Sequence, residues 1–328
     1  MTGYQFYWES DGAGGARLLR AFGETAHVVL PDCIGKVPIT EIGPYCFAKD
    51  RKLPGAYRIA GERDDTFFHE LSGDYIESVI LPDSVQKLGS FAFYNCRRLK
   101  EVAFGGTLHK TGSDVFMNCR CFSRMTVRGD ANKLTGAACI LVQVSSEITL
   151  VFGKGEEKAV LLFPAYTESY DEIAPAHIFG RKIEGEGVRA RQCIRGGALD
   201  FAQYDDVFPS ACAAAEPERT LCEMAVGRIC YPAGLSSQAR GRYHAYVREH
   251  AAFLCKTLVA EKKIEQMEVL CENGFLDREA LETAIFLASQ SGWAEGVALL
   301  FSIKEKYFPE NKVKKERYAF EEIPYTDA

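Results

Sequence analysis

The sequence predicts an α+β protein in which a short β-solenoid of stacked repeats precedes a small antiparallel β region and a C-terminal helical-hairpin region. Three observations support this fold class. One segment recurs at an offset of 23 residues, the middle of the chain alternates β-branched stretches with turns, and the last third has apolar residues at helical spacing. The expected domains are residues 1–127, 128–205 and 206–310, followed by a charged tail at 311–328.

The repeat is clearest in two stretches, "FAFYNCRRLKEVAF" from Phe91 and "SDVFMNCRCFSRMTV" from Ser113. An earlier copy at 42–53 lies 46 residues upstream of the first, which is twice the period. The segment 54–75 departs from the pattern, so it is either an insertion or a degenerate unit. A fixed period of this size is typical of stacked structural units, because one unit cannot bury its apolar face alone.

Each unit contains an alternating strand, a turn and an apolar residue for the interior. In "SVILPD" the alternation places Val79 and Leu81 on one face, and the Pro-Asp that follows turns the chain. Gly89 and Gly112 occupy equivalent positions, where we expect a turn that requires positive φ. Phe93 and its copies are expected to form a ladder inside the solenoid.

The stretch "IESVILPDSVQKLGSFAFYNCRRLKEVAF" resembles the BspA-type leucine-rich repeat, with its Ile-Pro-Asp-Ser-Val turn, Ile-Gly-x-x-Ala-Phe stretch and Asn-Cys-x-x-Leu stretch. The resemblance is specific over 76–127 and looser over 20–53. It implies a short curved β-solenoid whose repeats serve protein–protein or surface recognition and carry no catalytic residues. Residues 1–20 are expected to form a hairpin that caps this solenoid.

The middle of the chain is expected to form a small antiparallel sheet packed beside the end of the solenoid. The expected strands are "AACILVQVS", "EITLVFG", "KAVLLFP", "HIFGRKIEG" and "GVRARQCI".

From about residue 206 the spacing of apolar residues becomes helical. We expect one long helix over 236–262 and a helix that ends at Asn273-Gly274. At an offset of 29, "LVAEKKIEQMEVLCENG" superposes on "LASQSGWAEGVALLFSI", so that Leu270 falls on Leu299. The stretch 258–307 resembles ankyrin-like helical hairpins, which implies a second small binding-type surface.

The 12 cysteines show no zinc-ligand spacing and are expected to be reduced packing residues. Cys96 and Cys119 recur at one stacking position, and His109 corresponds to Gln86 in the preceding unit, so no histidine repeats with them. We therefore expect no catalytic residue, no metal site and no cofactor. A disulfide between the two cysteines is the alternative if the protein is exported.

The net charge of -6 argues against nucleic-acid binding as the main task. The N-terminus shows no signal peptide and no 18-residue apolar run occurs, so we expect a cytoplasmic protein without membrane insertion. Secretion is the alternative if a leader was removed.

The sequence favours a non-enzymatic interaction or scaffold protein that binds an unknown protein partner through repeat surfaces. The alternatives are a secreted or cell-surface adhesin-type leucine-rich-repeat protein, and an enzyme with an unrecognised site in 128–235. From the 23-residue register, the exposed strand ladder expected to bind contains Glu77, Ser78, Ile80, Lys100, Glu101, Arg124 and Thr126.

Overall fold

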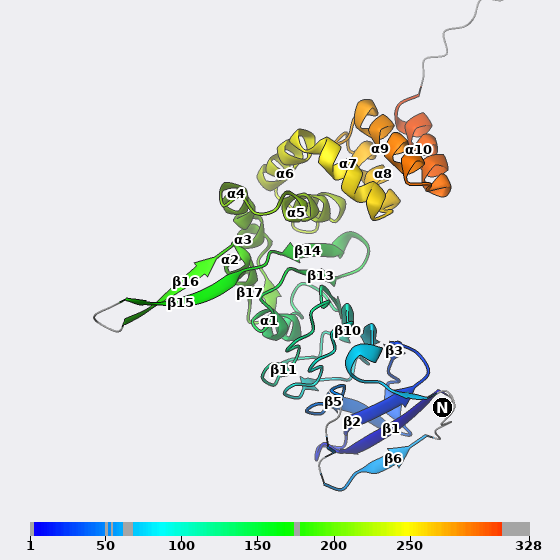
Figure 1. Ribbon diagram of the computed structural model, residues 1–328, viewed down its shortest axis with the longest axis vertical. Coiled ribbons are helices and arrows are strands. Elements are labelled where there is room, and N and C mark those ends of the chain that lie inside the picture. Colours follow the sequence, from blue (N-terminus) through cyan, green and yellow to red (C-terminus); the bar gives the residue numbers. More distant parts are fainter. Residues whose placement is uncertain (1–2, 50–51, 54, 62–67, 174–177, 310–328) are drawn as a thin grey trace, which may run out of the picture. The chain divides into compact units, whose positions relative to one another are not determined.

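The computed structural model describes residues 3–49, 52–53, 55–61, 68–173 and 178–309 (Figure 1). The chain divides into two compact units, residues 1–249 and residues 250–328. The α+β class is confirmed, with a β-solenoid and small antiparallel sheets in the first unit and helices in both. The predicted tail at 311–328 lies outside the described residues.

One sheet of the solenoid, here called the front sheet, is a ladder of five parallel strands with an antiparallel strand added at one end. Ser78 pairs with Glu101, and Glu101 pairs with Arg124, which confirms the 23-residue register. In chain order the strands are β3 (His27–Val29), β8 (Ser78–Ile80), β10 (Glu101–Gly105), β12 (Arg124–Arg128), β13 (Ile148–Phe152) and the antiparallel β14 (Ala159–Phe163).

The second sheet contains the other short strand of each turn of the solenoid and the N-terminal hairpin. The predicted hairpin is confirmed, because its two strands pair antiparallel around a turn in which Asp11 accepts hydrogen bonds from the backbone of Ala13 and Gly15. The strands are β1 (Tyr4–Ser10), β2 (Ala16–Gly23), β5 (Val37–Ile42), β6 (Arg58–Ala60), β9 (Lys87–Leu88) and β11 (Lys110–Thr111), with β4 (Cys33–Ile34) and β7 (His69–Glu70) paired beside β5 and β2.

The described part of 54–75 is an insertion and not a turn of the solenoid. Phe47 stacks directly on Phe93, with ring centroids 4.8 Å apart. Strand β3 likewise pairs with β8, and β5 with β9, so no strand intervenes in either sheet. The inserted strands β6 and β7 pair instead with the N-terminal hairpin. The offset of 46 residues therefore contains one turn of the solenoid and an insertion.

The solenoid core is packed as predicted, but the repeated glycines are needed for a reason other than the predicted positive φ. Val79 and Leu81 are fully buried, and the Phe93 ring stacks on Phe116 at 5.1 Å. Gly89 and Gly112 do not have positive φ, so that prediction was wrong. A Cβ at Gly89 would lie 2.4 Å from the backbone nitrogen of Pro44, and one at Gly112 2.4 Å from that of Ser90. Glycine is needed here because stacked backbones approach too closely for a side chain.

The positive φ angles of the turns occur two residues later in the chain. Tyr45, Phe91 and Asp114 occupy equivalent positions and have φ of 57°, 59° and 52°. The sequence prediction therefore placed the left-handed residue two positions too early.

The middle region extends the solenoid instead of packing beside its end, because β13 continues the parallel ladder from β12. The predicted strand "AACILVQVS" is wrong: helix α1 (Thr135–Leu141) covers most of it. Ala137, Ile140, Leu141 and Val144 are buried at helical spacing, which overrides their β propensity. The predicted strand "GVRARQCI" is also largely a helix, α2 (Gly187–Arg191).

The remaining strands and short helices of this region form small separate elements. Strands β15 (Thr167–Ile173) and β16 (Ile178–Glu184) pair as an antiparallel ribbon (Figure 1). The others are β17 (Ile194–Arg195), β18 (Ala198–Leu199) and the 3-10 turn η2 (Gly155–Glu157). A further 3-10 turn, η1 (Gly73–Tyr75), lies at the end of the inserted segment.

Four helices complete the first unit: α3 (Phe201–Asp205), α4 (Val207–Ala213), α5 (Glu218–Cys230) and α6 (Ser237–Glu249). Their centre is a buried ion pair in which the Arg228 guanidinium donates to both carboxylate oxygens of Asp205, at 2.8 and 3.1 Å. The Tyr243 hydroxyl donates to the same carboxylate at 2.8 Å. The predicted single helix over 236–262 is wrong, because it breaks at His250 between α6 and α7.

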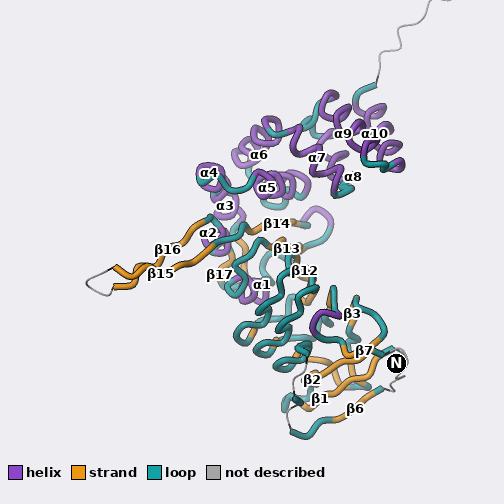
Figure 2. Tube along the Cα trace, viewed as in Figure 1, coloured by secondary structure: helices purple, strands orange, loops and turns teal. Residues whose placement is uncertain are grey.

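The described part of the second unit, which ends at residue 309, contains two helical pairs. They are α7 (Ala251–Ala260) with α8 (Ile264–Glu272), and α9 (Arg278–Gln290) with α10 (Ala294–Tyr307), all purple in Figure 2. The pairs correspond at an offset of 30 residues, not the predicted 29, because the left-handed turn at Lys262 recurs at Gly292. Leu270 therefore corresponds to Leu300, and both are fully buried. The ankyrin-like resemblance of this stretch stays a prediction.

Candidate functional site

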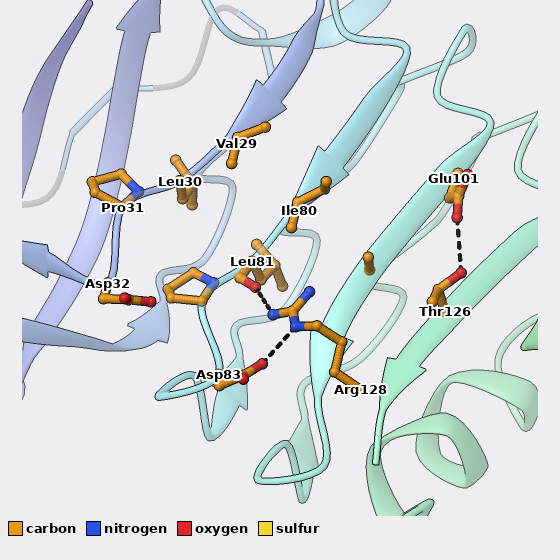
Figure 3. A pocket seen from close by; sticks show the side chains of 12 residues that line it. Val29, Leu30, Pro31, Asp32, Ile80, Leu81, Asp83, Glu101, Thr126 and Arg128 are labelled. Carbon is orange, nitrogen blue, oxygen red and sulfur yellow. Dashed lines mark hydrogen bonds and ion pairs between the residues drawn. The ribbon is translucent and has the colours of Figure 1, made fainter. Parts of the chain in front are cut away.

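A groove of about 610 Å³ crosses the exposed face of the front sheet over β3, β8, β10 and β12 (Figure 3). Each strand contributes residues from equivalent positions, so the groove is a direct product of the repeat. Its lining consists of Val29, Leu30, Pro31, Asp32, Ile80, Leu81, Pro82, Asp83, Glu101, Ala103, Thr126 and Arg128.

The groove has an aliphatic end. Val29 pairs with Ile80 and Ile80 with Ala103 across the parallel strands, so their side chains point to the same face. Val29 is 53% exposed and Ile80 is 41% exposed. Two neighbouring branched side chains in water leave apolar surface that a partner can bury.

The rim of the groove is charged and partly ordered. The Arg128 Nε donates to the Asp83 carboxylate at 2.6 Å, and the same guanidinium donates to the carbonyl of Leu81. Figure 3 shows this side chain extended from β12 across β10 toward β8. Asp32 lies at the position equivalent to Asp83 and is exposed to solvent. Because Arg128 already pairs with Asp83, Asp32 is the rim carboxylate most open to a positive group on a partner.

Three of the seven residues predicted to bind line the groove, namely Ile80, Glu101 and Thr126. The Thr126 hydroxyl donates to the Glu101 carboxylate at 2.8 Å. The other four lie on or beside the same strands but outside the lining: Glu77, Ser78, Lys100 and Arg124.

Glu77 lies in a local cluster of ion pairs. Lys100 donates to its carboxylate at 3.0 Å and Arg98 donates to the other oxygen. These two cations, Lys100 first, lower the pKa of the Glu77 carboxyl. Glu77 and Lys100 therefore bind each other across neighbouring turns.

The sequence prediction missed the groove residues contributed by the first turn of the solenoid and by the strand ends. Val29, Asp32, Asp83 and Arg128 belong to this group. The signal was present, because "VVLPD" ending at Asp32 and "VILPD" ending at Asp83 match closely. Extending the strand ladder by this pentapeptide would have included both aspartates.

The repeated Asn-Cys of the turns is structural. Asn95 and Asn118 have left-handed backbones, with φ of 61° and 63°, and asparagine tolerates this region better than most residues. The Asn118 amide also donates to the side-chain oxygen of Asn95 at 2.9 Å. The Cys119 thiol donates to the carbonyl of Phe93 at 2.9 Å, and burial raises the pKa of the Cys96 thiol. A thiol that is hard to ionise is a poor nucleophile, which agrees with packing residues.

A second cavity of about 410 Å³ lies in the region where an enzyme site was the alternative, lined by Asp130, Ala131, Asn132, Glu156, Glu157, Phe201, Ala233 and Gly234. This lining contains the carboxylates of Asp130, Glu156 and Glu157, and no cysteine, serine, histidine or lysine. Among the described residues no group of three His, Cys, Asp or Glu side chains is placed to hold a metal ion, and no helix is long and apolar enough to cross a membrane.

Comparisons with known proteins agree with the repeat seen in the structure. Residues 64–142 match the sequence family described as "BspA type Leucine rich repeat region (6 copies)". No curated protein matches the chain.

Two solved structures are similar to part of the chain. One is a leucine-rich repeat protein of T. pallidum, 18% identical over 40% of this chain and 55% of that one, with a TM-score of 0.28. The other is a leucine rich cell surface protein from Faecalibacterium prausnitzii, 24% identical over 39% of this chain and 28% of that one, with a TM-score of 0.26. The chain thus spans about half or less of the length of each.

Proposed function

Since residues 64–142 match the BspA-type leucine-rich repeat family, we propose that this protein is a non-enzymatic interaction protein that binds a protein partner in the groove of its front sheet. One observation carries the proposal. Val29 and Ile80 expose aliphatic surface side by side on a rigid parallel ladder, beside the solvated carboxylate of Asp32.

The geometry favours a particular kind of partner segment. An aliphatic side chain laid over Val29 and Ile80 would be removed from water together with them. A lysine or arginine next to it would face Asp32, and the Asp83–Arg128 pair would accept polar groups without first losing its own contact. The groove therefore suits a segment that combines an aliphatic and a basic residue.

The test is a capture experiment with Ile80→Glu. Ile80 is exposed, so the substitution leaves the core intact while it places a charge in the aliphatic end of the groove. We expect the specific partner recovered by the wild-type chain from native lysate, and then rebound in purified form, to lose at least about tenfold in affinity.

Val142→Glu is the matched control, because Val142 is 75% exposed and lies outside the groove. This variant should keep the partner. The proposal fails if no specific partner is recovered, or if the purified partner binds Ile80→Glu as tightly as it binds wild type.

We propose that the protein acts in the cytoplasm, and the thiols provide the test. In a reducing compartment the stacked Cys96 and Cys119 stay reduced, whereas export would favour a bond between them. Mass spectrometry of unreduced protein from its native host should show unlinked peptides. A linked 96–119 peptide would instead support the secreted or surface alternative.

A further inference from the structure

The Arg128 guanidinium lies in a small binding site that one turn of the solenoid forms from two acceptors. Its Nε donates to the Asp83 carboxylate at 2.6 Å, and its Nη2 donates to the backbone carbonyl of Leu81. The Leu81 side chain is fully buried, so Leu81 lines the groove through its backbone. Two nitrogens of one planar group therefore bind two acceptors that lie two residues apart in the chain.

The preceding turn of the solenoid repeats the same pair of acceptors. The pentapeptide "VVLPD" ending at Asp32 matches "VILPD" ending at Asp83, and β3 pairs with β8 in the same register. Leu30 and Asp32 therefore hold the positions of Leu81 and Asp83 one turn earlier, and both pairs line the groove (Figure 3). The Leu30 side chain is also buried, which leaves its backbone to face the groove.

The repeat supplies these acceptors twice but the guanidinium only once. Arg128 reaches back from β12 across β10 to Asp83, two turns away (Figure 3). Two turns after Asp32, the residue that pairs with Arg128 and holds its position in the ladder is Gly105. Glycine has no side chain, so the site at Asp32 receives no equivalent of Arg128.

The acceptors at Leu30 and Asp32 are left available by the local sequence. The Leu30 amide donates to the Ile80 carbonyl at 3.0 Å, so the Leu30 carbonyl faces the same neighbouring chain, where the next residue in register is Pro82. Proline has no N–H to donate. Among the described residues no donor is hydrogen-bonded to the Leu30 carbonyl or to the Asp32 carboxylate.

We propose that the Asp32 carboxylate and the Leu30 carbonyl bind the guanidinium of an arginine that the protein partner presents. This inference rests on the proposed function and names the residue type that the groove recognises. Arginine suits the site better than lysine, because its planar fork places separate N–H groups on a carboxylate and a carbonyl, as Arg128 does on Asp83 and Leu81.

The aliphatic end of the groove also suits this arginine. Arg128 crosses β10 to reach its acceptors, and the residue of β10 in register with Ile80 is the small Ala103. An arginine bound at Asp32 in the same geometry crosses β8, where Ile80 is 41% exposed. Its methylene groups then cover aliphatic surface while its guanidinium meets the carboxylate.

Titration of the full chain with Nα-acetyl-arginine N-methylamide, followed by NMR of the backbone amides, tests the site without any partner. We expect saturable shifts at Leu30, Asp32 and Cys33, with a dissociation constant in the millimolar range. The corresponding lysine amide should bind at least about threefold more weakly. Asp32→Asn should raise the dissociation constant of the arginine probe by about tenfold, because it removes the charge of the acceptor.

Two further variants sharpen the test. Arg128→Ala should free the Asp83 carboxylate and the Leu81 carbonyl, so the arginine probe should shift amides at 81–84 that it leaves unchanged in wild type. Asp114→Asn is the matched control, because it makes the same change at an exposed aspartate outside the groove. This control should bind the probe like wild type.

The inference is overturned if the arginine and lysine probes bind equally, if Asp114→Asn weakens binding as much as Asp32→Asn, or if Arg128→Ala gains no second site. It is also overturned if Ile80→Glu loses the recovered partner while Asp32→Asn binds that partner as tightly as wild type, a result that leaves the proposed function intact. If the probe binds as expected but no partner is recovered, the guanidinium site stands and the proposed function fails.

Discussion

The substitution Gly89→Ala tests how the turns of the solenoid stack. In the structure, Gly89 has an ordinary φ and lies against the turn before it, where a new Cβ would approach the Pro44 nitrogen to 2.4 Å and the Gly43 carbonyl carbon to 2.6 Å. Both atoms belong to the backbone, so no side-chain rotation can make room. Ordinary contact begins near 3.4 Å, so the two turns must separate by about 1 Å.

The loss of folding free energy follows from the contacts that this separation of the two turns weakens. The amide of Gly89 donates to the carbonyl of Ile42 at 2.7 Å, and a displacement of this size weakens that bond, at about 1 kcal/mol. Overpacking of a dense interior costs a further ~1–3 kcal/mol. Gly89→Ala should therefore lower the free energy of unfolding by about 3 kcal/mol.

Urea unfolding followed by circular dichroism measures the free energy of unfolding of Gly89→Ala, and two other variants serve for comparison. Gly241→Ala is the control, because Gly241 is exposed in helix α6 with no atom within 4 Å of its Cβ position, and it should gain about 1 kcal/mol. Gly89→Asn should be at least as damaging as Gly89→Ala. If asparagine were tolerated while alanine was not, the glycine would be serving a left-handed turn, and the close-approach explanation would be refuted.

Three further predictions concern the free energy of unfolding in the same assay. Asn95→Ala should cost about 1 kcal/mol because its left-handed backbone strains an alanine, and Asn95→Gly should cost less; equal costs would contradict this reason. Asp205→Asn should cost about 3 kcal/mol or more because it leaves the buried Arg228 charge uncompensated, and a loss below about 1 kcal/mol would show that the pair is dispensable. Burial raises the pKa of the Cys222 thiol from 9.0 to about 12, so the unfolded chain releases this proton first and stability should fall as the pH rises from 9 toward 12. The Cys222→Ala variant should show a shallower fall, and an unchanged slope would contradict this assignment.

The solenoid could be predicted from the sequence because its repeat fixes contacts between residues 23 positions apart. The pairs Ser78–Glu101 and Glu101–Arg124 follow from that offset alone. The groove was predicted only in part. The offset of 23 residues indicates which residues share a face of the sheet, but it does not indicate where on that face a groove forms. Ile80 and Thr126 were therefore found, whereas Arg128 was missed because its position depends on its contact with Asp83.

Other features depended on contacts that no local pattern contains. The segment 54–75 could not be classified, because its identity as an insertion follows from contacts across it, namely the stacking of Phe47 on Phe93 and the pairing of β3 with β8 and of β5 with β9. Helix α1 was predicted as a strand because its β-branched composition outweighed the helical spacing of Ala137, Ile140 and Leu141. The offset of 29 was wrong by one residue because apolar matches alone do not locate the turn at Lys262.

The most direct test of the proposed binding function is hydrogen–deuterium exchange of the full chain with and without its purified partner. The groove predicts slower exchange on four strands that are far apart in sequence, around residues 29–32, 80–83, 101–104 and 126–128. Amides in the ribbon β15–β16 should keep their rates. Protection confined to that ribbon or to the turns at Asn95 and Asn118, with none in these four strand segments, would contradict the proposal.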